Sequence, residues 1–131
     1  MGNLKPLVVG MNPGPRNFVS KNSSIGRLNS WFSEIGIHHY AFVNVWHVPG
    51  TFRKSEVDTE FLSSVLRTWD GPVVALGLVP SSVLDEIGVS HLRIPHPSFR
   101  NRVYNDPETV RVTVKLIKEF TEVESCHRED R

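Results

Sequence analysis

The sequence predicts an α/β fold with a four-stranded parallel sheet covered by helices on both faces. Short apolar runs alternate with longer segments of helical period, in the order β-α-β-α-β-α-β-α, and the connections between them are short. Strands that alternate with helices are joined by right-handed crossovers, which make the sheet parallel and bury both of its faces. The 131 residues are enough for one domain with a single core. We assign residues 1–121 to this domain and residues 122–131 to a polar C-terminal tail.

The first strand and the first helix are predicted in the N-terminal third of the chain. The first strand is predicted over residues 5–10, where a short apolar run ends in a glycine, as is typical of a buried parallel strand. Residues 17–24 form a polar loop. From Ile25 the period becomes helical, and Gly36 ends the helix. The predicted buried stripe of this helix consists of Leu28, Trp31, Phe32 and Ile35.

The second strand is predicted over residues 40–46, where β-branched and aromatic residues dominate before Pro49 and Gly50. Ser55 resembles a helix N-cap, with Asp58 three residues later as the acidic member of a capping box. The stripe of the second helix then follows at helical spacing and consists of Phe61, Leu62, Val65, Leu66 and Trp69.

The C-terminal half repeats the alternation of strand and helix. Residues 73–78 and 91–94 are the third and fourth predicted strands. Between them, Pro80 suits the first turn of a short helix that Gly88 closes. Asp106 suits the N-cap of the last helix. This helix is expected to bury Val110, Val114, Ile117 and Phe120, and the tail from Glu122 is expected to fray.

Charge is nearly balanced, with 15 basic and 14 acidic residues and a net charge of +1, which argues against a disordered chain. Residues 1–56 carry a charge of +4 and residues 57–131 carry −3. An anion-facing surface is therefore expected mainly in the N-terminal half, together with Arg100 and Arg102. The single cysteine, Cys126, excludes a disulfide within the chain and fits a reducing compartment.

No apolar stretch approaches the ~20 residues of a membrane span, so we expect neither a signal peptide nor a transmembrane segment. A zinc site is not expected, because His38, His39 and Cys126 lack ligand spacing to a third partner. Nucleotide hydrolysis is not expected either, because the glycine-containing stretch after the first strand lacks the Lys-Ser/Thr of a P-loop.

Polar loops follow three of the predicted strands, after Gly10, after Val43 and after Ile94. The carboxyl ends of parallel strands share one edge of the sheet, and ligands bind in the crevice beyond that edge. Asn12 is expected at the mouth of this crevice, on a loop stiffened by the prolines that follow it. An ordinary turn asparagine is the alternative for this position.

The stretch Gly10-Met11-Asn12-Pro13-Gly14-Pro15 resembles the first motif of the uracil-DNA glycosylase superfamily, closest to its single-strand-selective monofunctional branch. His96-Pro97-Ser98, followed by Arg100-Asn101, resembles the second motif. Val43-Asn44-Val45-Trp46 with Arg53, Gly26-Arg27-Leu28 and Val74-Ala75-Leu76-Gly77 are similar to segments of the thermostable iron–sulfur branch. The similarity covers residues 7 to about 102 and implies a three-layer α/β/α sandwich, the uracil-DNA glycosylase-like fold.

The chain departs from this family in several ways. The cluster cysteines of the iron–sulfur branch are absent, and the chain is shorter than typical members. Ser24-Ile25 stands where that branch has an aromatic residue that stacks on the extruded base, and Phe18 is the candidate to replace it. Phe99 stands where the single-strand-selective branch has proline, and it would suit an apolar wedge.

The resemblance implies a monofunctional DNA glycosylase that removes uracil or a related damaged or modified pyrimidine. Its expected partner is single- or double-stranded DNA, and it is expected to act as a monomer without cofactor or metal, in the cytoplasm or on nucleoid or nuclear DNA. Asn12 would hold the attacking water, His96 would donate a hydrogen bond to the departing base, and Asn44 would read the base edge. Lys54 is the one lysine of the motif loops, so a Schiff-base step is not expected.

Other residues are given supporting roles, each with a structural alternative. The base-binding candidates are Met11, Asn44, Phe18 and Trp46, with His47 beside them. The phosphate-binding candidates are Pro13, Gly14, Arg53, Ser98, Arg100 and Arg102. Trp46 could equally be core, Asn44 could satisfy a strand end, His96 could be a satisfied loop histidine, and the arginines could be solvated surface charges.

Two other functions remain open at this point. The fold could serve as a binding module for DNA or a free nucleotide, which the missing stacking aromatic and the short chain favour. It could also be an accessory protein of viral DNA base modification, which the small size alone suggests.

Overall fold

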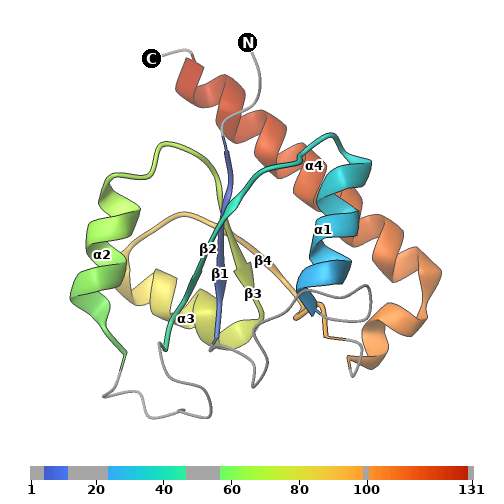
Figure 1. The fold of residues 1–131 in the computed structure, drawn as a ribbon, viewed down its shortest axis with the longest axis horizontal. Coiled ribbons are helices and arrows are strands. Elements are labelled where there is room, and N and C mark those ends of the chain that lie inside the picture. Colours follow the sequence, from blue (N-terminus) through green and yellow to red (C-terminus); the bar gives the residue numbers. More distant parts are fainter. Residues whose placement is uncertain (1–4, 12–23, 47–56, 99–100, 130–131) are drawn as a thin grey trace.

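The computed structural model describes residues 5–11, 24–46, 57–98 and 101–129, with side chains up to residue 122. It has an α/β fold with one four-stranded sheet in the order β2-β1-β3-β4, and every neighbouring pair is parallel (Figure 1). The strands are β1 (Leu7–Gly10), β2 (Ala41–Asn44), β3 (Val73–Leu76) and β4 (Leu92–Ile94). The helices are α1 (Ser24–Glu34), α2 (Thr59–Arg67), α3 (Leu78–Ile87), α4 (Pro107–Glu129) and the 3-10 helix η2 (Arg102–Asn105). The predicted α/β class with a parallel sheet is confirmed.

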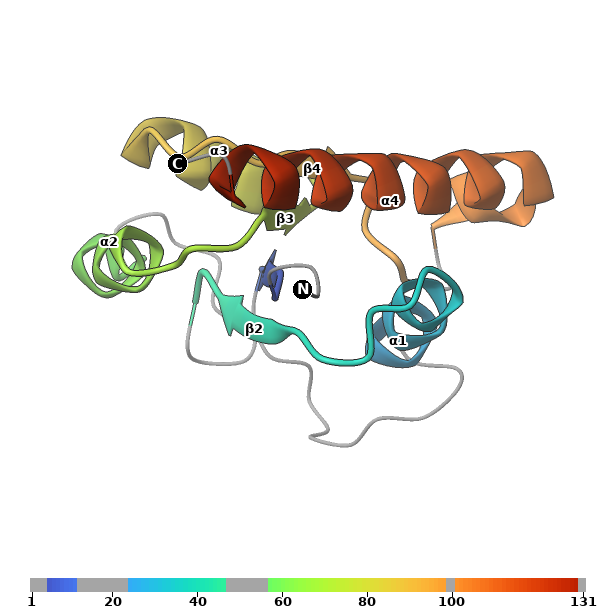
Figure 2. The same cartoon turned by 90° about the horizontal axis from the view of Figure 1, so that it is seen from above.

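Helices cover both faces of this sheet. Successive side chains of a strand point to opposite faces, so apolar strand residues pack against helices on each side. Leu7 and Val9 of β1 pack into a core cluster with α2 and α3, whereas Val8 packs into a second cluster with α1 and α4. Figure 2 shows α2 and α1 on opposite sides of the strands, and α4 crosses β4 in this view. The arrangement is consistent with a three-layer sandwich.

Glycines end two of the helices as the sequence predicts. Gly36 follows α1 with φ at 83°, and Gly88 follows α3 in the left-handed conformation, with its N–H bonded to the carbonyl oxygens of Leu84 and Asp85. Glycine adopts this backbone conformation without the clash that a Cβ would cause.

The start of α2 differs from the prediction. Asp58, and not Ser55, is the N-cap, because its carboxylate accepts a hydrogen bond from the backbone N–H of Phe61 at 3.0 Å. Ser55 lies outside the described residues. Phe61 was expected in the buried stripe, but it is 43% exposed. Leu62 and Leu66, one turn apart, form the buried centre of the helix instead.

Beyond β3, the boundaries also differ from the prediction. β3 ends at Leu76 rather than at residue 78, because Gly77, with φ at 96°, turns the chain directly into α3. The helix η2 was not predicted, and it places Tyr104 in the core. α4 continues to Glu129, through the segment where a frayed tail was expected.

The buried stripe of α4 is partly polar. Ile117 is buried as expected, but Phe120 is only partly buried, and Thr113 and Thr121 lie in the interior. Each threonine hydroxyl donates to the carbonyl oxygen four residues earlier at 2.8 Å. This bond satisfies the hydroxyl within the helix, so the side chain can be buried. None of the described helices has the length and apolar character that crossing a membrane requires.

A partly buried hydrogen bond joins α3 to the segment that enters β4. The Oγ of Ser81 lies 2.7 Å from the Nε2 of His91, and the Nδ1 of His91 lies 2.9 Å from the carbonyl oxygen of Val89. A carbonyl oxygen only accepts, so Nδ1 donates to it, and Nε2 pairs with the Ser81 hydroxyl.

Replacing Ser81 with alanine is expected to lower the free energy of unfolding by about 1–3 kcal/mol, because the Nε2 of the buried His91 side chain loses its hydrogen bond to Ser81. Urea denaturation monitored by circular dichroism measures the change. Ser82→Ala is the matched control, since the Ser82 hydroxyl is exposed and donates to the carbonyl oxygen of Leu78 in its own helix. Equal losses in the two variants would contradict the assigned role of the Ser81–His91 bond.

Candidate active site

The carboxyl ends of the four parallel strands meet at one edge of the sheet, at the bottom of Figure 1. β1 ends at Gly10 and β2 ends at Asn44, and the strand register pairs these two residues directly. β4 ends at Ile94, two residues before His96, at the same edge. The topology therefore brings Met11, Asn44 and His96, three of the predicted site residues, to one edge.

Asn44 lies directly against the backbone of Gly10. A Cβ atom placed on Gly10 would lie 2.7 Å from the Oδ1 of Asn44 and 2.8 Å from the Cζ of Phe42. Beyond this pair the parallel ladder continues, because the N–H of Val45 bonds to the carbonyl of Gly10 at 2.9 Å. Gly10 is thus the residue whose missing side chain leaves room for the Asn44 amide.

Met11 and Trp46 continue from these two strand ends. The N–H of Trp46 donates to the carbonyl of Met11 at 2.9 Å. Trp46 is buried in the core cluster that faces α2 and α3, and Met11 is partly buried against that cluster. Of the two alternatives for Trp46, base-binding residue or core residue, the structure favours the core.

The segment of residues 95–98, here called the His96 loop, has all four of its carbonyl oxygens bonded. The Tyr104 hydroxyl donates to Pro95 at 2.6 Å, and the Asn101 amide donates to His96 at 3.0 Å. Arg27 of α1 lies 3.5 Å from the carbonyl oxygen of Pro97 and 3.3 Å from that of Ser98. The backbone N–H of Asn101 also donates to Ser98 at 3.0 Å. These donors tie the loop to α1 and to the region of η2.

The ring of His96 is held in one tautomer. Its Nδ1 accepts a hydrogen bond from the backbone N–H of Ser98 at 3.1 Å, so the proton of the neutral imidazole is on Nε2. Among the described residues, none bonds to Nε2. Burial lowers the pKa of His96 below its usual value of 6.5, because the charged ring loses hydration. At neutral pH the ring is therefore a neutral donor through Nε2.

The guanidinium of Arg27 is positioned by two aromatic rings. Its central carbon lies 5.8 Å from the ring centroid of Trp31 and 5.4 Å from that of Tyr104. Burial raises the pKa of Tyr104 to about 12, and this effect outweighs the charge of Arg27, which acts to lower it. The phenol therefore stays protonated and keeps donating to Pro95.

Sequence reasoning assigned no role to Arg27, Asn101 or Tyr104. Arg27 and Asn101 stand within the segments that carry the family resemblance, which was the available signal for them. Tyr104 carried no such signal. Arg27 and Ser98 are 71 positions apart, and no periodicity within the sequence connects them.

The remaining predicted site residues divide into two groups. Ser98 is partly buried and holds the His96 ring, while Arg102 is exposed at the start of η2. The others lie outside the described residues: Asn12, Pro13, Gly14, Phe18, His47, Arg53, Phe99 and Arg100.

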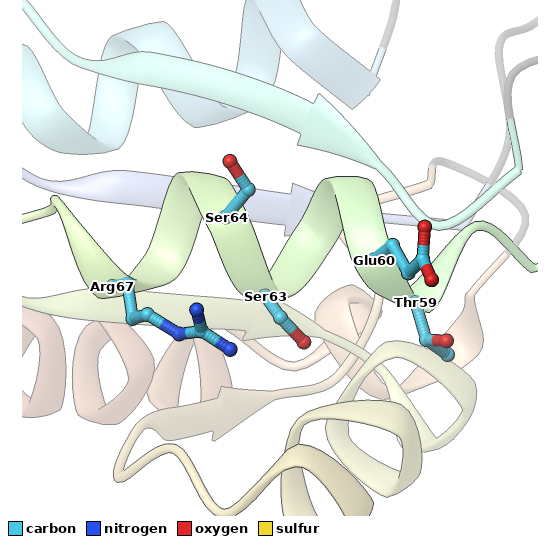
Figure 3. Close-up of a pocket in the computed structure, with 5 residues that line it drawn as sticks. All are labelled: Thr59, Glu60, Ser63, Ser64 and Arg67. Carbon is cyan, nitrogen blue, oxygen red and sulfur yellow. The ribbon is translucent and has the colours of Figure 1, made fainter.

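Two surface hollows among the described residues lie away from Asn44 and His96. One, of about 260 Å³, follows the outer face of α2 and is lined by Thr59, Glu60, Ser63, Ser64 and Arg67 (Figure 3). The other follows α1 and is lined by Asn29, Ser30, Ser33 and Glu34. Each is lined by a single helix and includes neither Asn44 nor His96. Within the described ranges, no three His, Cys, Asp or Glu side chains converge as a metal site would require.

Gly10→Ala is expected to displace Asn44 and to lower the free energy of unfolding by about 1–3 kcal/mol, because the new methyl group overlaps the Asn44 amide and the Phe42 ring. In the double variant Gly10→Ala/Asn44→Ala, part of this loss should be recovered, since one of the two clashing groups is gone. A double-mutant cycle of urea denaturation measures the coupling. Strictly additive effects would contradict the packing of Asn44 on Gly10.

The ring of His96 is expected to titrate below pH 6.5 in a ¹H–¹³C NMR titration, with its signal identified by its absence in His96→Gln. The unfolded chain then binds a proton in a pH range where the folded protein does not. Stability contributed by the neutral ring is thus complete above pH 6.5 and falls as the pH drops through the folded-state pKa. The His96→Gln variant should show a smaller loss of stability between pH 7 and pH 5. A His96 midpoint above 6.5 would contradict the burial argument.

Comparisons of this chain with protein-family models, with curated proteins and with solved structures found no match. Support for a function therefore comes from the geometry of the carboxyl edge and from the motif resemblance.

Proposed function

We propose that this protein is a monofunctional DNA glycosylase that hydrolyses the N-glycosidic bond of uracil or of a related damaged or modified pyrimidine. The observation that carries the proposal is the state of His96. Its Nδ1 accepts from Ser98, and its lowered pKa keeps it neutral, so Nε2–H is a fixed donor at the carboxyl edge of the sheet. The resemblance to the two motifs of the uracil-DNA glycosylase superfamily agrees with such a donor.

The chemistry requires a donor of this kind. As the glycosidic bond breaks, the sugar becomes oxocarbenium-like and the pyrimidine leaves as an anion. A preorganised neutral donor stabilises the developing charge on the pyrimidine oxygen without transferring its proton, and such electrostatic stabilisation is usually the largest catalytic contribution. His96 Nε2–H has this role in the proposal.

Asn44 and Asn12 supply the other two functions. The Asn44 amide has both a donor and an acceptor, which match the O4 and N3–H of uracil. Its position against Gly10 at the end of β2 supports a role in reading the base. Asn12, which follows β1 after Met11, is proposed to hold the attacking water. Because an amide does not accept the water's proton as a carboxylate does, the expected rate is modest.

DNA is the proposed partner, and the base must leave its stack to reach these groups. Extrusion costs a few kcal/mol, less for a mismatched or single-stranded base. Arg102, exposed beside the His96 loop at the start of η2, is a proposed phosphate contact that positions the strand without reading its sequence. Ser98, Pro13, Gly14, Arg53 and Arg100 remain proposed phosphate contacts, and Phe99 remains the proposed wedge.

The proposal is tested by alkali-revealed cleavage of labelled oligonucleotides, single- and double-stranded, that contain uracil, hydroxymethyluracil or thymine opposite guanine. Wild-type protein is expected to excise at least one of these bases. His96→Ala and Asn12→Ala should each reduce the rate by about 10²-fold or more, the scale of losing a key anion donor. Ser82→Ala is the control. Ser82 is exposed on α3 and has no role in the proposed site, so this variant should retain full activity.

Two outcomes would contradict the proposal. A folded wild-type protein that binds the oligonucleotides in a salt-sensitive manner but leaves every base in place would reject the glycosylase. It would support the binding-module alternative, which the absence of an aromatic residue at Ser24-Ile25 favours. A covalent adduct trapped by borohydride would instead contradict the monofunctional mechanism.

A further inference from the structure

We propose that Arg27 is a positioning residue that sets the tautomer of His96 through the peptide bond between Pro97 and Ser98. This peptide unit connects the two side chains. Its carbonyl oxygen, on Pro97, lies 3.5 Å from Nη1 of Arg27, and its N–H, on Ser98, donates to Nδ1 of His96 at 3.1 Å. The peptide unit thus links the two side chains: the Arg27 guanidinium faces its carbonyl oxygen, and its N–H donates to the His96 imidazole.

The physical link is amide resonance. A cation beside the carbonyl oxygen draws electron density toward that oxygen, increases the double-bond character of the C–N bond and makes the N–H a stronger donor. A contact of 3.5 Å is long for a hydrogen bond, so the attraction at Pro97 is chiefly that of the charge. The same Nη1 lies 3.3 Å from the carbonyl of Ser98, so two successive carbonyls point toward one guanidinium.

A stronger Ser98 donor keeps Nδ1 of His96 unprotonated. The opposite tautomer, with the proton on Nδ1, would bring two N–H groups face to face across 3.1 Å. The proton is therefore held on Nε2, the nitrogen that donates to the leaving base in the proposed reaction. Arg27 reaches neither the base nor the sugar in this role; it acts through His96.

The surroundings of Arg27 suit this role better than they would suit a lysine. The rings of Trp31 and Tyr104 lie 4.9 Å apart by their centroids, and both are within 6 Å of the guanidinium carbon. Both rings belong to the core cluster between the sheet, α1 and α4. A planar guanidinium stacks on such rings and donates to two acceptors at once, whereas an ammonium group is a flexible point charge.

The test reads the His96 ring directly by ¹⁵N NMR, in the full chain, for wild type, Arg27→Met, Arg27→Lys and Arg111→Met. Wild type is expected to hold the proton on Nε2. Arg27→Met should move the tautomer ratio toward Nδ1–H by up to about twofold, because polarisation changes the strength of the Ser98–His96 hydrogen bond by about 10–30%. Arg27→Lys should move it in the same direction but less. Arg111→Met is the matched control, because Arg111 is an exposed arginine of α4 paired with Glu108, and it should leave the ratio unchanged.

An unchanged tautomer ratio in a folded Arg27 variant would overturn the proposal. Loss of folding in both Arg27 variants would also count against it, because Arg27 would then serve the stability of the fold. The effect on catalysis rests on the proposed glycosylase activity: Arg27→Met should lower kcat and leave KM nearly unchanged. A tautomer shift in a protein that excises no base would reject the glycosylase and retain the role of Arg27.

Discussion

The structure depends on parallel pairing of β1 with both of its neighbours. β1 bonds to β2 on one side and to β3 on the other, and its residues Leu7, Val8 and Val9 are at most 1% exposed. A shift of register by one residue would turn Leu7 and Val9 toward α1 and α4 and Val8 toward α2 and α3, so the packing of two different core clusters depends on this pairing. One consequence is that Gly10 stands beside Asn44. Another is that the polar segments after β1, β2 and β4 leave the sheet at the same edge.

At that edge, the His96 loop is held by donors from two separate parts of the chain, α1 and the region of η2. Arg27 comes from α1, Asn101 from the segment before η2, and Tyr104 from η2 itself. Pro95 and Pro97 restrict the same loop from within, because each proline fixes its own φ angle. A donor held in this way needs no rearrangement when charge develops on a substrate, and this is the property that preorganised catalytic sites share.

The burial of His96 has two opposite effects. It disfavours the charged imidazole, so the folded protein loses stability in acid as the unfolded chain takes up the proton. The same burial keeps the ring neutral near pH 7, with its Nε2–H available at the edge of the sheet.

Local signals in the sequence determined the class of the fold. The alternation of apolar runs with helical periods predicted the parallel sheet, and Gly36 and Gly88 marked helix ends, because these features depend on a few neighbouring residues. Where the sequence offered more than one boundary, the structure shows which is used. Asp58 caps α2, where Ser55 was predicted, and Gly77 ends β3 two residues before the predicted end. Phe61 was misjudged because helical period does not determine how wide a face the sheet will cover.

The candidate site also combines features that the sequence predicts with features that only the tertiary structure decides. The positions of Asn44 and His96 at one edge were predictable, because the ends of parallel strands must share an edge. The contacts that support these two residues could not be predicted from the sequence. Whether Trp46 belongs to the core, whether Gly10 leaves room for an amide, and whether Arg27 reaches a loop 71 residues away all depend on packing between distant segments. Tertiary structure alone decides such contacts, since they arise only when α1, β4 and η2 are brought together.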